Sequence, residues 1–490
     1  MDVSDYKAGG YKKGYGGYSY FLPSKINHSW IFSDPQVQAL LSEADRALGK
    51  LDAFSEYLPD VDYFIRMHLS KEATQSSRIE GTRTNIEEVF IGEQDIDPEK
   101  RDDWVEVQNY LAAINTAINQ LNVLPFSNRL LKNTHKTLMQ GVRGEKKLPG
   151  EFRSSQNWIG VSLKNAIFVP PHHDYVIDLM SDLEKFINSE SDVPHLIKIA
   201  IAHYQFETIH PFLDGNGRLG RLMIALYLAS FNQLHKPALY LSDYFERNKV
   251  EYVDRMMAVR QSNNMKAWLI FFLHGVLETS KNSIQVFKDI MTVKSKVESE
   301  VLPYFSTRRQ QGAQELMRHL YQSPVVTIKD VSELLNIQVN TAAALIKDFE
   351  KHGVLTRLTA RVRSRLYGFS EYMAIFERKI EISPFEEAIN TQEDTTEDTT
   401  EDTIVYSQEN IQMLDWKIKE LILRIDGICS RAEIQSLLAL KDAEHVRKQY
   451  ILPALKMKVI EMTLPDKPSS KLQKYRLTSK GYSFLRYIKL

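Results

Sequence analysis

Residues 210–221 of this 490-residue chain have the sequence HPFLDGNGRLGR, and this stretch decides how the chain around it folds. The spacing of apolar residues predicts an amphipathic helix over residues 194–207 and a second helix over residues 217–230. Two glycines flank Asn216 in the loop between them, so backbone N–H groups can converge there without Cβ atoms in the way. Because the second helix starts at this point, its dipole favours an anion, and the stretch predicts a phosphate-binding loop.

Four charged or titratable side chains of the stretch suit nucleotide chemistry. His210 has an imidazole that can act as a general base near neutral pH, and Asp214 offers the hard oxygen ligands that suit Mg²⁺. Arg218 and Arg221 are three residues apart on one helix face, where two guanidinium groups can hold a polyphosphate. Each feature alone is common on ordinary surfaces, but together and in this order they favour a nucleotide-transfer site. The chain contains no GxxxxGK[ST] motif, which excludes a P-loop.

The composition of the chain excludes several classes of protein. It carries 62 Lys and Arg residues against 63 Asp and Glu residues, so any binding to nucleic acid must be local. Its single cysteine, Cys429, excludes a disulfide scaffold and a multi-cysteine zinc site. It has no run of about 18 apolar residues, and its polar N-terminus lacks the apolar segment of a signal peptide. We therefore expect a cytoplasmic protein that does not enter a membrane.

Helical spacing of apolar residues continues, with few interruptions, from residue 35 to about residue 301. Before it, residues up to Pro23 are expected to form a tail or an arm packed at an edge. Within it, residues 156–161 and 166–169 are aromatic and β-branched, which predicts a small β-hairpin. The sequence therefore predicts a mainly α fold with one hairpin on an all-α body.

Residues 304–368 predict a separate unit with the helices-then-ribbon order of a winged helix. Its helices are expected over residues 309–321, 328–335 and 339–351, and its paired strands over residues 354–355 and 365–367. The unit has ten Lys and Arg residues against five acids. The predicted wing carries Arg357, Arg361, Arg363 and Arg365. Binding of DNA through its phosphates and binding of another protein are both open interpretations.

The last part of the chain repeats this pattern after a break. Residues 383–405 carry eight carboxylates and no Lys or Arg, in near-repeats of EDTT, which predicts a flexible linker. Helical segments over residues 409–456 and strand-like segments over residues 459–464 and 473–477 predict a second winged helix. The expected domains are an N-terminal region at 1–100, a core at 101–300, a winged helix at 304–382, the linker at 383–405 and a second winged-helix-like domain at 406–490.

Residues 210–221 match the Fic family signature, H-x-F-x-[D/E]-G-N-G-R-x-x-R, at every fixed position, so the chain resembles this family. The resemblance implies an all-α Fic core with a β-hairpin flap, and transfer of AMP from ATP to a Tyr, Thr or Ser hydroxyl of a target protein. It implies that His210 deprotonates this hydroxyl and that Asp214 holds Mg²⁺. It also implies an ATP site made of Gly215, Asn216, Gly217, Arg218, Leu219, Gly220, Arg221 and Tyr252. Tyr252 follows from the region that walls adenine in the family, where a pair of tyrosines is frequent; this chain has Tyr252-Val253.

A second segment, residues 75–81 with the sequence QSSRIEG, closes a long predicted helix that begins near residue 61. Glu80 is then at a helix C-terminus, where the dipole disfavours an anion by roughly 0.3–1 kcal/mol. Alone, such a carboxylate is best interpreted as a solvated group. The segment resembles the family's inhibitory motif, [S/T]-x-x-x-E-[G/N], through Ser76, Glu80 and Gly81. The resemblance implies that Glu80 pairs with Arg221, takes the γ-phosphate position and keeps resting activity low.

The predicted hairpin at residues 156–171 resembles the flap of the family. An exposed strand edge there can pair with an extended segment of a target protein. Two alternatives to an autoinhibited adenylyltransferase stay open. The same site could remove AMP, with Glu80 orienting a water, or transfer a different nucleotide. The chain could also be a regulator that binds DNA through residues 304–368 and whose Fic domain only senses ATP. Auto-modification and a homodimer stay open as well.

Overall fold

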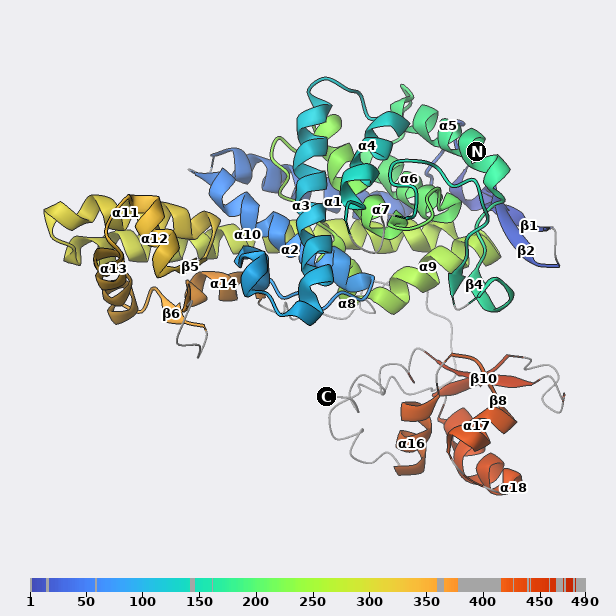
Figure 1. The fold of residues 1–490 in the computed structure, drawn as a ribbon. Coiled ribbons are helices and arrows are strands. Elements are labelled where there is room, and N and C mark those ends of the chain that lie inside the picture. The colour runs from blue at the N-terminus through green and yellow to red at the C-terminus, as the bar shows by residue number, and fades with distance from the viewer. Residues whose placement is uncertain are drawn as a thin grey trace, which may run out of the picture. The chain divides into compact units, whose positions relative to one another are not determined.

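The computed structural model of the chain forms two compact units, residues 1–382 and residues 383–490 (Figure 1). The structure describes residues 2–377 except 15–16, 58–59, 142–145, 161 and 359–364, and residues 416–481 except 426, 439, 441, 458, 464–469, 471–472 and 479–480. The expected linker at residues 383–405 lies outside the described residues. The first unit contains the expected regions 1–100, 101–300 and 304–382, and the boundaries between them stay a prediction.

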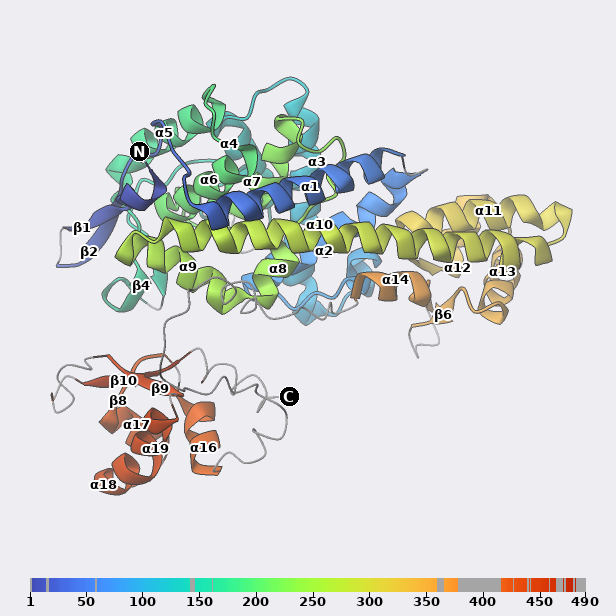
Figure 2. The same ribbon diagram turned by 180° about the vertical axis from the view of Figure 1, so that it is seen from behind.

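Helices build most of the first unit, which confirms the predicted mainly α fold. They are α1 (Pro35–Tyr57), α2 (Val61–Ile79), α3 (Arg101–Leu121), α4 (Asn128–Leu138), α5 (Val176–Asn188), α6 (His195–Ile209), α7 (Asn216–Ser230), α8 (Ser242–Arg247), α9 (Lys249–Ser262) and α10 (Met265–Lys296). Short 3₁₀ turns lie at Val3–Asp5, Glu87–Phe90, Glu93–Asp95, Pro98–Lys100, Leu163–Asn165, His173–Tyr175 and Leu302–Tyr304, and a π turn at Val297–Val301. Helix α1 runs beside α10, the longest helix (Figure 2).

Helix α6 lies at the centre of the core that positions the site. All residues from 196 to 209 are buried, including Lys198, whose Nζ donates to the Ser189 carbonyl at 2.9 Å. The expected amphipathic pattern is therefore wrong, because α5, α7 and α10 cover this helix on several sides. The two helices flanking the 210–221 stretch are confirmed, with α6 ending two residues later and α7 starting one residue earlier than predicted.

The predicted hairpin at 156–171 is confirmed in a shorter form, as β3 (Ile159–Gly160) paired antiparallel with β4 (Ala166–Phe168). The N-terminal residues also form strands, β1 (Gly9–Lys13) and β2 (Ser19–Pro23), which pair antiparallel. The Phe21 N–H donates to the Val169 carbonyl at 2.9 Å, and the Phe21 side chain is buried. Of the two expectations for this segment, the edge-packed arm holds, and its strands were not predicted.

The first unit ends in a smaller module with the predicted helices-then-ribbon order. Its elements are α11 (Thr307–Gln322), β5 (Val325–Thr327), α12 (Ile328–Leu335), α13 (Val339–Lys351), β6 (Thr356–Arg357), β7 (Leu366–Gly368) and α14 (Ser370–Glu377). The sheet has the order β5-β7-β6 and is antiparallel. The sequence predicted α11, α12 and α13 within two residues, placed the ribbon one or two residues early, and missed β5 and α14. Arg361 and Arg363 lie outside the described residues.

The second unit has the same order on a smaller scale. Its elements are α16 (Trp416–Arg424), β8 (Cys429–Ser430), α17 (Arg431–Leu437), α18 (Ala443–Val446), a π turn (Arg447–Ile451), α19 (Leu452–Lys456), β9 (Ile460–Met462) and β10 (Lys474–Leu477). The sheet has the order β8-β10-β9, and Cys429 is buried in the apolar core. In the described part of the chain, every helix is too short or too polar to span a membrane.

Candidate active site

The loop between α6 and α7 is held in shape by two left-handed residues and one amide side chain. His210 caps α6 with φ 50° and ψ 62°, and Gly215 precedes α7 with φ 71°. The Asn216 side chain accepts from the Phe212 N–H at 2.8 Å and donates to the Phe212 carbonyl at 2.9 Å. Because these bonds occupy the Asn216 amide, a phosphate in this loop would meet backbone N–H groups instead.

His135 of α4 also holds this loop in place. Its Nδ1 accepts from the Gly150 N–H at 2.9 Å, and its Nε2 lies 3.0 Å from the Asp214 carbonyl. The ring stacks on the fully buried Phe212 at 3.8 Å between centroids. Burial lowers the pKa of His135 to about 4, so the ring is neutral and Nε2–H is its donor. His135 therefore fixes the backbone of Asp214.

Arg153 ties His210 to both ends of the flap. Its Nε donates to the His210 carbonyl at 2.9 Å, its Nη1 to the Ser155 carbonyl at 3.1 Å and its Nη2 to the Pro171 carbonyl. The side chain is buried, and burial lowers its pKa to about 10, so it stays charged at neutral pH. One rigid guanidinium thus sets the position of the His210 backbone relative to the flap.

A cavity of about 620 Å³ opens beside this loop. Its walls include His210, Asp214, the first turn of α7 at residues 215–218, Arg221 and Tyr252. Leu219 is fully buried, and Leu219 and Gly220 are not among the lining residues. Burial lowers the pKa of His210 to about 4, and the Arg153 guanidinium acts in the same direction. The imidazole is therefore neutral at pH 7 and can accept a proton.

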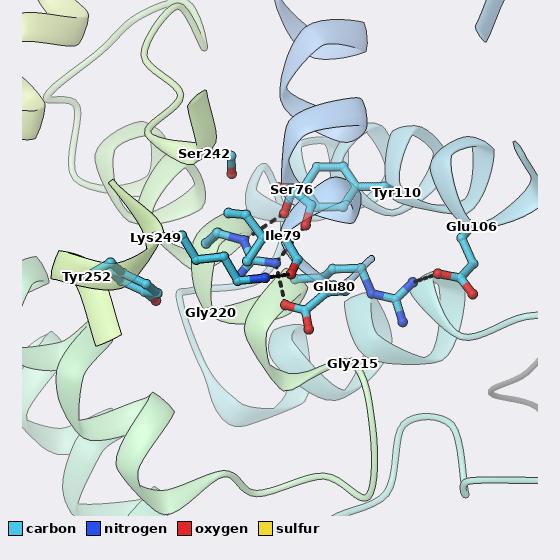
Figure 3. A network of polar contacts seen from close by, with 12 residues as sticks. Ser76, Ile79, Glu80, Glu106, Tyr110, Gly215, Gly220, Ser242, Lys249 and Tyr252 are labelled. Atoms are coloured by element: carbon cyan, nitrogen blue, oxygen red, sulfur yellow. Dashed lines mark hydrogen bonds and ion pairs between the residues drawn. The ribbon is translucent and has the colours of Figure 1, made fainter. Parts of the chain in front are cut away.

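Arg221 joins this cavity to the end of α2, where Ser76 and Glu80 are labelled in Figure 3. Its Nη2 donates to Glu80 Oε1 at 2.7 Å and to the Ser76 carbonyl at 2.8 Å, and its Nε donates to Ser76 Oγ at 2.9 Å. The Arg221 side chain is only 2% exposed, whereas that of Glu80 is 42% exposed and faces the cavity. Burial raises the pKa of Glu80, but the charge of Arg221 and its hydrogen bond outweigh it, so the pKa is lowered.

Two cations compensate the C-terminus of α2. The Glu80 N–H bonds to the Ser77 carbonyl, which leaves the Ser76 carbonyl free to accept from Arg221. The Ile79 carbonyl accepts from Lys249 Nζ at 2.6 Å, a contact drawn in Figure 3. These positive charges offset the unfavourable placement of the Glu80 carboxylate at a helix C-terminus. Gly217 permits the arrangement, because a Cβ there would collide with Glu80 Oε1.

The other arginine of the motif has a carboxylate partner too. Arg218 Nη1 donates to Glu106 Oε2 of α3 at 3.1 Å, and the Arg218 side chain is 6% exposed. The carboxylate of Asp214 has no Lys, Arg or His partner within the described residues, and its Oδ1 accepts from the Gly215 N–H at 2.6 Å. One oxygen of Asp214 is therefore available to a cation, as a magnesium site shared with phosphates requires.

Tyr252 and Glu207 also line the cavity. Tyr252 is 4% exposed, its hydroxyl lies 2.8 Å from His203 Nε2, and its ring stacks on Phe245. Glu207 is buried without a hydrogen-bond partner on Oε1, and it packs against Gly220, where a Cβ would collide with it. Burial raises the pKa of Glu207 to about 7, although Arg221 opposes the shift.

Five of the residues just described were missed from the sequence: Glu106, His135, Arg153, Glu207 and Lys249. Each acts on the site through a contact between distant segments, and none belongs to a local motif. Only Glu207 had a signal in the sequence, because it lies three residues before His210 in the last turn of the helix that precedes the loop.

Comparison with known proteins shows which domain contains this site. Residues 125–228 match the Fic/DOC family, and residues 38–119 match the Fic/DOC family N-terminal domain. The chain is a Fic-domain protein. Residues 417–478 match the C-terminal domain of the Fic-like filamentation-induced-by-cAMP proteins, which lies within the second unit.

Individual relatives share only part of this Fic-domain protein. Protein adenylyltransferase fic-1 of Caenorhabditis briggsae is 35% identical over 81 residues, which cover 16% of this chain and 15% of that protein. Protein adenylyltransferase Fic of Drosophila yakuba is 42% identical over 77 residues, which cover 15% of this chain and 14% of that protein. A crystal structure of a Fic family protein from Desulfovibrio desulfuricans G20 covers 93% of this chain and 99% of its own at 19% identity, with a TM-score of 0.43. The sequence matches to the two curated adenylyltransferases span only about one seventh of the length of those proteins.

Proposed function

We propose that this Fic-domain protein is a protein adenylyltransferase that moves AMP from ATP to a Tyr, Thr or Ser hydroxyl of a target protein and is restrained by Glu80. The observation that carries the proposal is the 620 Å³ cavity in which a neutral His210, Asp214, the first turn of α7 and Arg221 meet. The name of the curated relatives, protein adenylyltransferase, supports the same reaction.

The reaction needs one proton acceptor and several groups that bind phosphate. The target oxygen attacks the α phosphorus of ATP, the bond from that phosphorus to the bridging oxygen breaks, pyrophosphate leaves, and the hydroxyl proton passes to His210. Backbone N–H groups of residues 215–218 and the two motif arginines would hold the phosphates. Mg²⁺ held by Asp214 would neutralise phosphate charge. Catalysis of this kind comes mainly from positioning and charge, which the contacts of Arg153 and His135 supply.

Glu80 restrains this site by its contact with Arg221. A γ phosphate bound to Arg221 would have to replace the carboxylate, which holds the guanidinium through a charge-assisted bond of 2.7 Å. The carboxylate also lies against Gly217, in the turn proposed to hold the phosphates. ATP and Glu80 therefore compete for the same cation, and resting activity is low.

The flap is the proposed docking edge for the target protein. Trp158, Ile159 and Ile167 are exposed large hydrophobic residues on this short hairpin, which is unusual for a solvated turn. Trp158 and Ile159 also line the cavity. An extended target segment paired with this edge would place its hydroxyl side chain near His210.

The proposal is tested with the purified full chain, Mg²⁺ and nucleotides labelled on the α phosphate. Transfer of label to protein from ATP, but not from GTP, CTP or UTP, supports adenylyl transfer. Label from another nucleotide assigns a different group, and release of AMP from previously modified protein assigns the reverse reaction. No labelling by a variant without Glu80, with ATP still bound, would contradict the proposal when target proteins from a cell extract are present.

We expect AMP transfer to be insensitive to pH around neutrality, because His210 is already in its basic form. Its pKa of about 4 keeps the imidazole neutral above pH 6, and activity falls only as pH approaches 4. The Glu80→Gly variant is used, since Glu80 raises the pKa of His210 and its removal extends the flat region. Initial rates at saturating ATP between pH 5.5 and 8 provide the measurement.

Glu207, with a pKa of about 7, also titrates between pH 5.5 and 8, so the experiment needs a control variant for this residue. A step near pH 7 that disappears in Glu80→Gly/Glu207→Gln belongs to Glu207. A step near pH 6.5 that survives this substitution would be the titration of an ordinary histidine and would contradict the assignment of His210.

We expect Lys249→Met to release the brake partly. The substitution keeps the length of the side chain but removes the cation that bonds to the Ile79 carbonyl, so the end of α2 is held less firmly. A charge at a helix C-terminus contributes about 0.3–1 kcal/mol, which predicts AMP transfer about two- to fivefold above wild type. In the Glu80→Gly background the same substitution should give no gain. A gain of equal size in both backgrounds would place Lys249 in nucleotide binding instead.

We propose AMP transfer ahead of DNA binding by residues 304–368, since several basic residues of that module have acidic partners. Arg309 pairs with Asp348 at 2.6 Å, and Arg318 pairs with Glu315 at 2.6 Å. A shift of duplex DNA by the full chain that weakens with rising salt would favour the regulator alternative.

A further inference from the structure

One row of side chains on α2 extends from the module of residues 305–377, which contains α11 to α14, to the catalytic cavity. The row takes every fourth residue of this helix: Phe64, His68, Glu72, Ser76 and Glu80. Residues at this spacing form a ridge that winds slowly around a helix, and sixteen residues extend over about 24 Å. The first four members are buried, so each has neighbours that must move if the helix moves.

The first end of the row contacts the module of residues 305–377. The Phe64 ring meets the Tyr321 ring of α11 edge-on at 5.8 Å, and the His68 ring meets the Phe376 ring of α14 edge-on at 5.2 Å. The Phe64, Tyr321 and Phe376 side chains are all buried. Helix α2 therefore packs directly on α11 and α14 of the module.

The other end of the row makes polar contacts with the catalytic core. Glu72 accepts from the Tyr110 hydroxyl at 2.8 Å and from the Ser242 hydroxyl at 2.6 Å. One turn later Ser76 accepts from Arg221, and after another turn Glu80 does the same. Such bonds weaken steeply with distance and angle, so a displacement of 1–2 Å, the usual size of a helix shift, would break the pair of Glu80 with Arg221.

The packing where the row meets the module leaves room for such a shift. A cavity of about 30 Å³ is lined by His68, Glu72, Gln75 and Phe376. His68 Nε2 and Gln75 Oε1 are buried there without a hydrogen-bond partner. A contact with unused space and unsatisfied polar atoms can adopt a second arrangement more easily than a close-packed one.

We infer that the docking of residues 305–377 on α2 sets the strength of the brake, so that a partner which alters this docking changes AMP transfer. The inference rests on the proposed autoinhibited transferase and adds the route by which a signal reaches it. A partner acts only by its different affinity for the two positions of α2. By the same linkage, ATP bound at Arg221 must change the affinity of the module for that partner by an equal factor.

The test is an epistasis experiment on the full chain. Phe376→Leu replaces the ring that contacts His68 with a smaller aliphatic side chain, and Phe64→Leu is the equivalent change on α2. Phe349→Leu is the matched control, because Phe349 is fully buried in the same module but packs on Phe305. Each variant is made with Glu80 present and in the Glu80→Gly background. The readouts are AMP transfer, thermal unfolding, and hydrogen exchange at the amides of residues 80–82.

With Glu80 present, Phe376→Leu and Phe64→Leu should raise AMP transfer about 2- to 30-fold, the range by which residues between coupled sites change coupling. Phe349→Leu should stay at the wild-type level, and no variant should gain activity without Glu80. Unchanged activity in both contact variants, or equal gains in Phe349→Leu, would overturn the inference.

Hydrogen exchange separates this inference from the function on which it rests. If Glu80→Gly is itself no more active than wild type, the proposed brake fails. In that case, faster exchange at residues 80–82 in Phe376→Leu and Phe64→Leu, but not in Phe349→Leu, would still support coupling between the module and the end of α2. Unchanged exchange in the first two variants would overturn it.

Discussion

Replacing Glu80 with glycine should raise AMP transfer roughly tenfold to 150-fold, the range that corresponds to the 1.5–3 kcal/mol of a hydrogen bond to a charged group. The physical reason is the 2.7 Å contact that occupies Arg221 in the resting protein. Without the carboxylate, the buried guanidinium keeps its two bonds to Ser76 and gains a free Nη2–H for a phosphate. Transfer of label from ATP labelled on the α phosphate is the measurement.

Two control variants separate the carboxylate from the backbone. Glycine adds conformational freedom at the end of α2, whereas Glu80→Ala keeps the ordinary helical φ of −84° found there. We expect Glu80→Ala to be as active as Glu80→Gly, because both lack the carboxylate. Glu80→Gln keeps the shape of the side chain without its charge and should fall between wild type and Glu80→Ala. A Glu80→Gly protein that binds ATP but is as inactive as wild type would show that this carboxylate is no brake.

The elements around the catalytic loop could be predicted because their signals are local. Helix α7 starts where Gly215 and Gly217 mark a turn, and the spacing of apolar residues after it is helical. The same spacing failed for α6, because the helix predicted to be amphipathic is buried throughout residues 196–209, including the charged Lys198 and Glu207. Both side chains are buried, because Lys198 finds a carbonyl on a neighbouring segment and Glu207 lies against Gly220. Whether a polar residue is buried depends on such distant partners.

The contacts that hold the site together could not be predicted from the sequence either, because they also join segments that are distant along the chain. Glu80 and Arg221 are 141 residues apart, and only a family motif could suggest that they meet. Arg153 belongs to no sequence motif, although its guanidinium bonds to the carbonyls of residues 155, 171, 209 and 210. The strands β1 and β2 were missed because the glycines and tyrosines of this segment suggest a loop, although the two strands pair with each other and β2 also bonds to Val169, which follows β4 of the flap.

Replacing His210 with asparagine should lower AMP transfer about 10²- to 10⁴-fold in the Glu80→Gly background, the usual contribution of a general base. Asparagine is chosen because His210 has a positive φ of 50°, which strains most side chains. Asparagine adopts such angles readily, and it does so at residues 232, 263 and 336 of this chain. The loop should therefore keep its shape while the proton acceptor is lost.

To interpret the His210→Asn variant, both the rate of AMP transfer and the affinity for ATP are measured and compared with those of Glu80→Gly. If His210 only takes the proton from the target hydroxyl, Glu80→Gly/His210→Asn should bind ATP as tightly as Glu80→Gly and differ in the rate alone. Calorimetric titration with ATP and the labelling assay measure the two quantities on the same protein. An equal loss in affinity would mean that His210 acts by holding the loop, whose backbone Arg153 and Asn216 already fix. A rate within threefold of Glu80→Gly, with affinity unchanged, would transfer the role of base to another group that lines the cavity. Glu207 would then be the first residue to substitute, since its pKa of about 7 suits a proton acceptor.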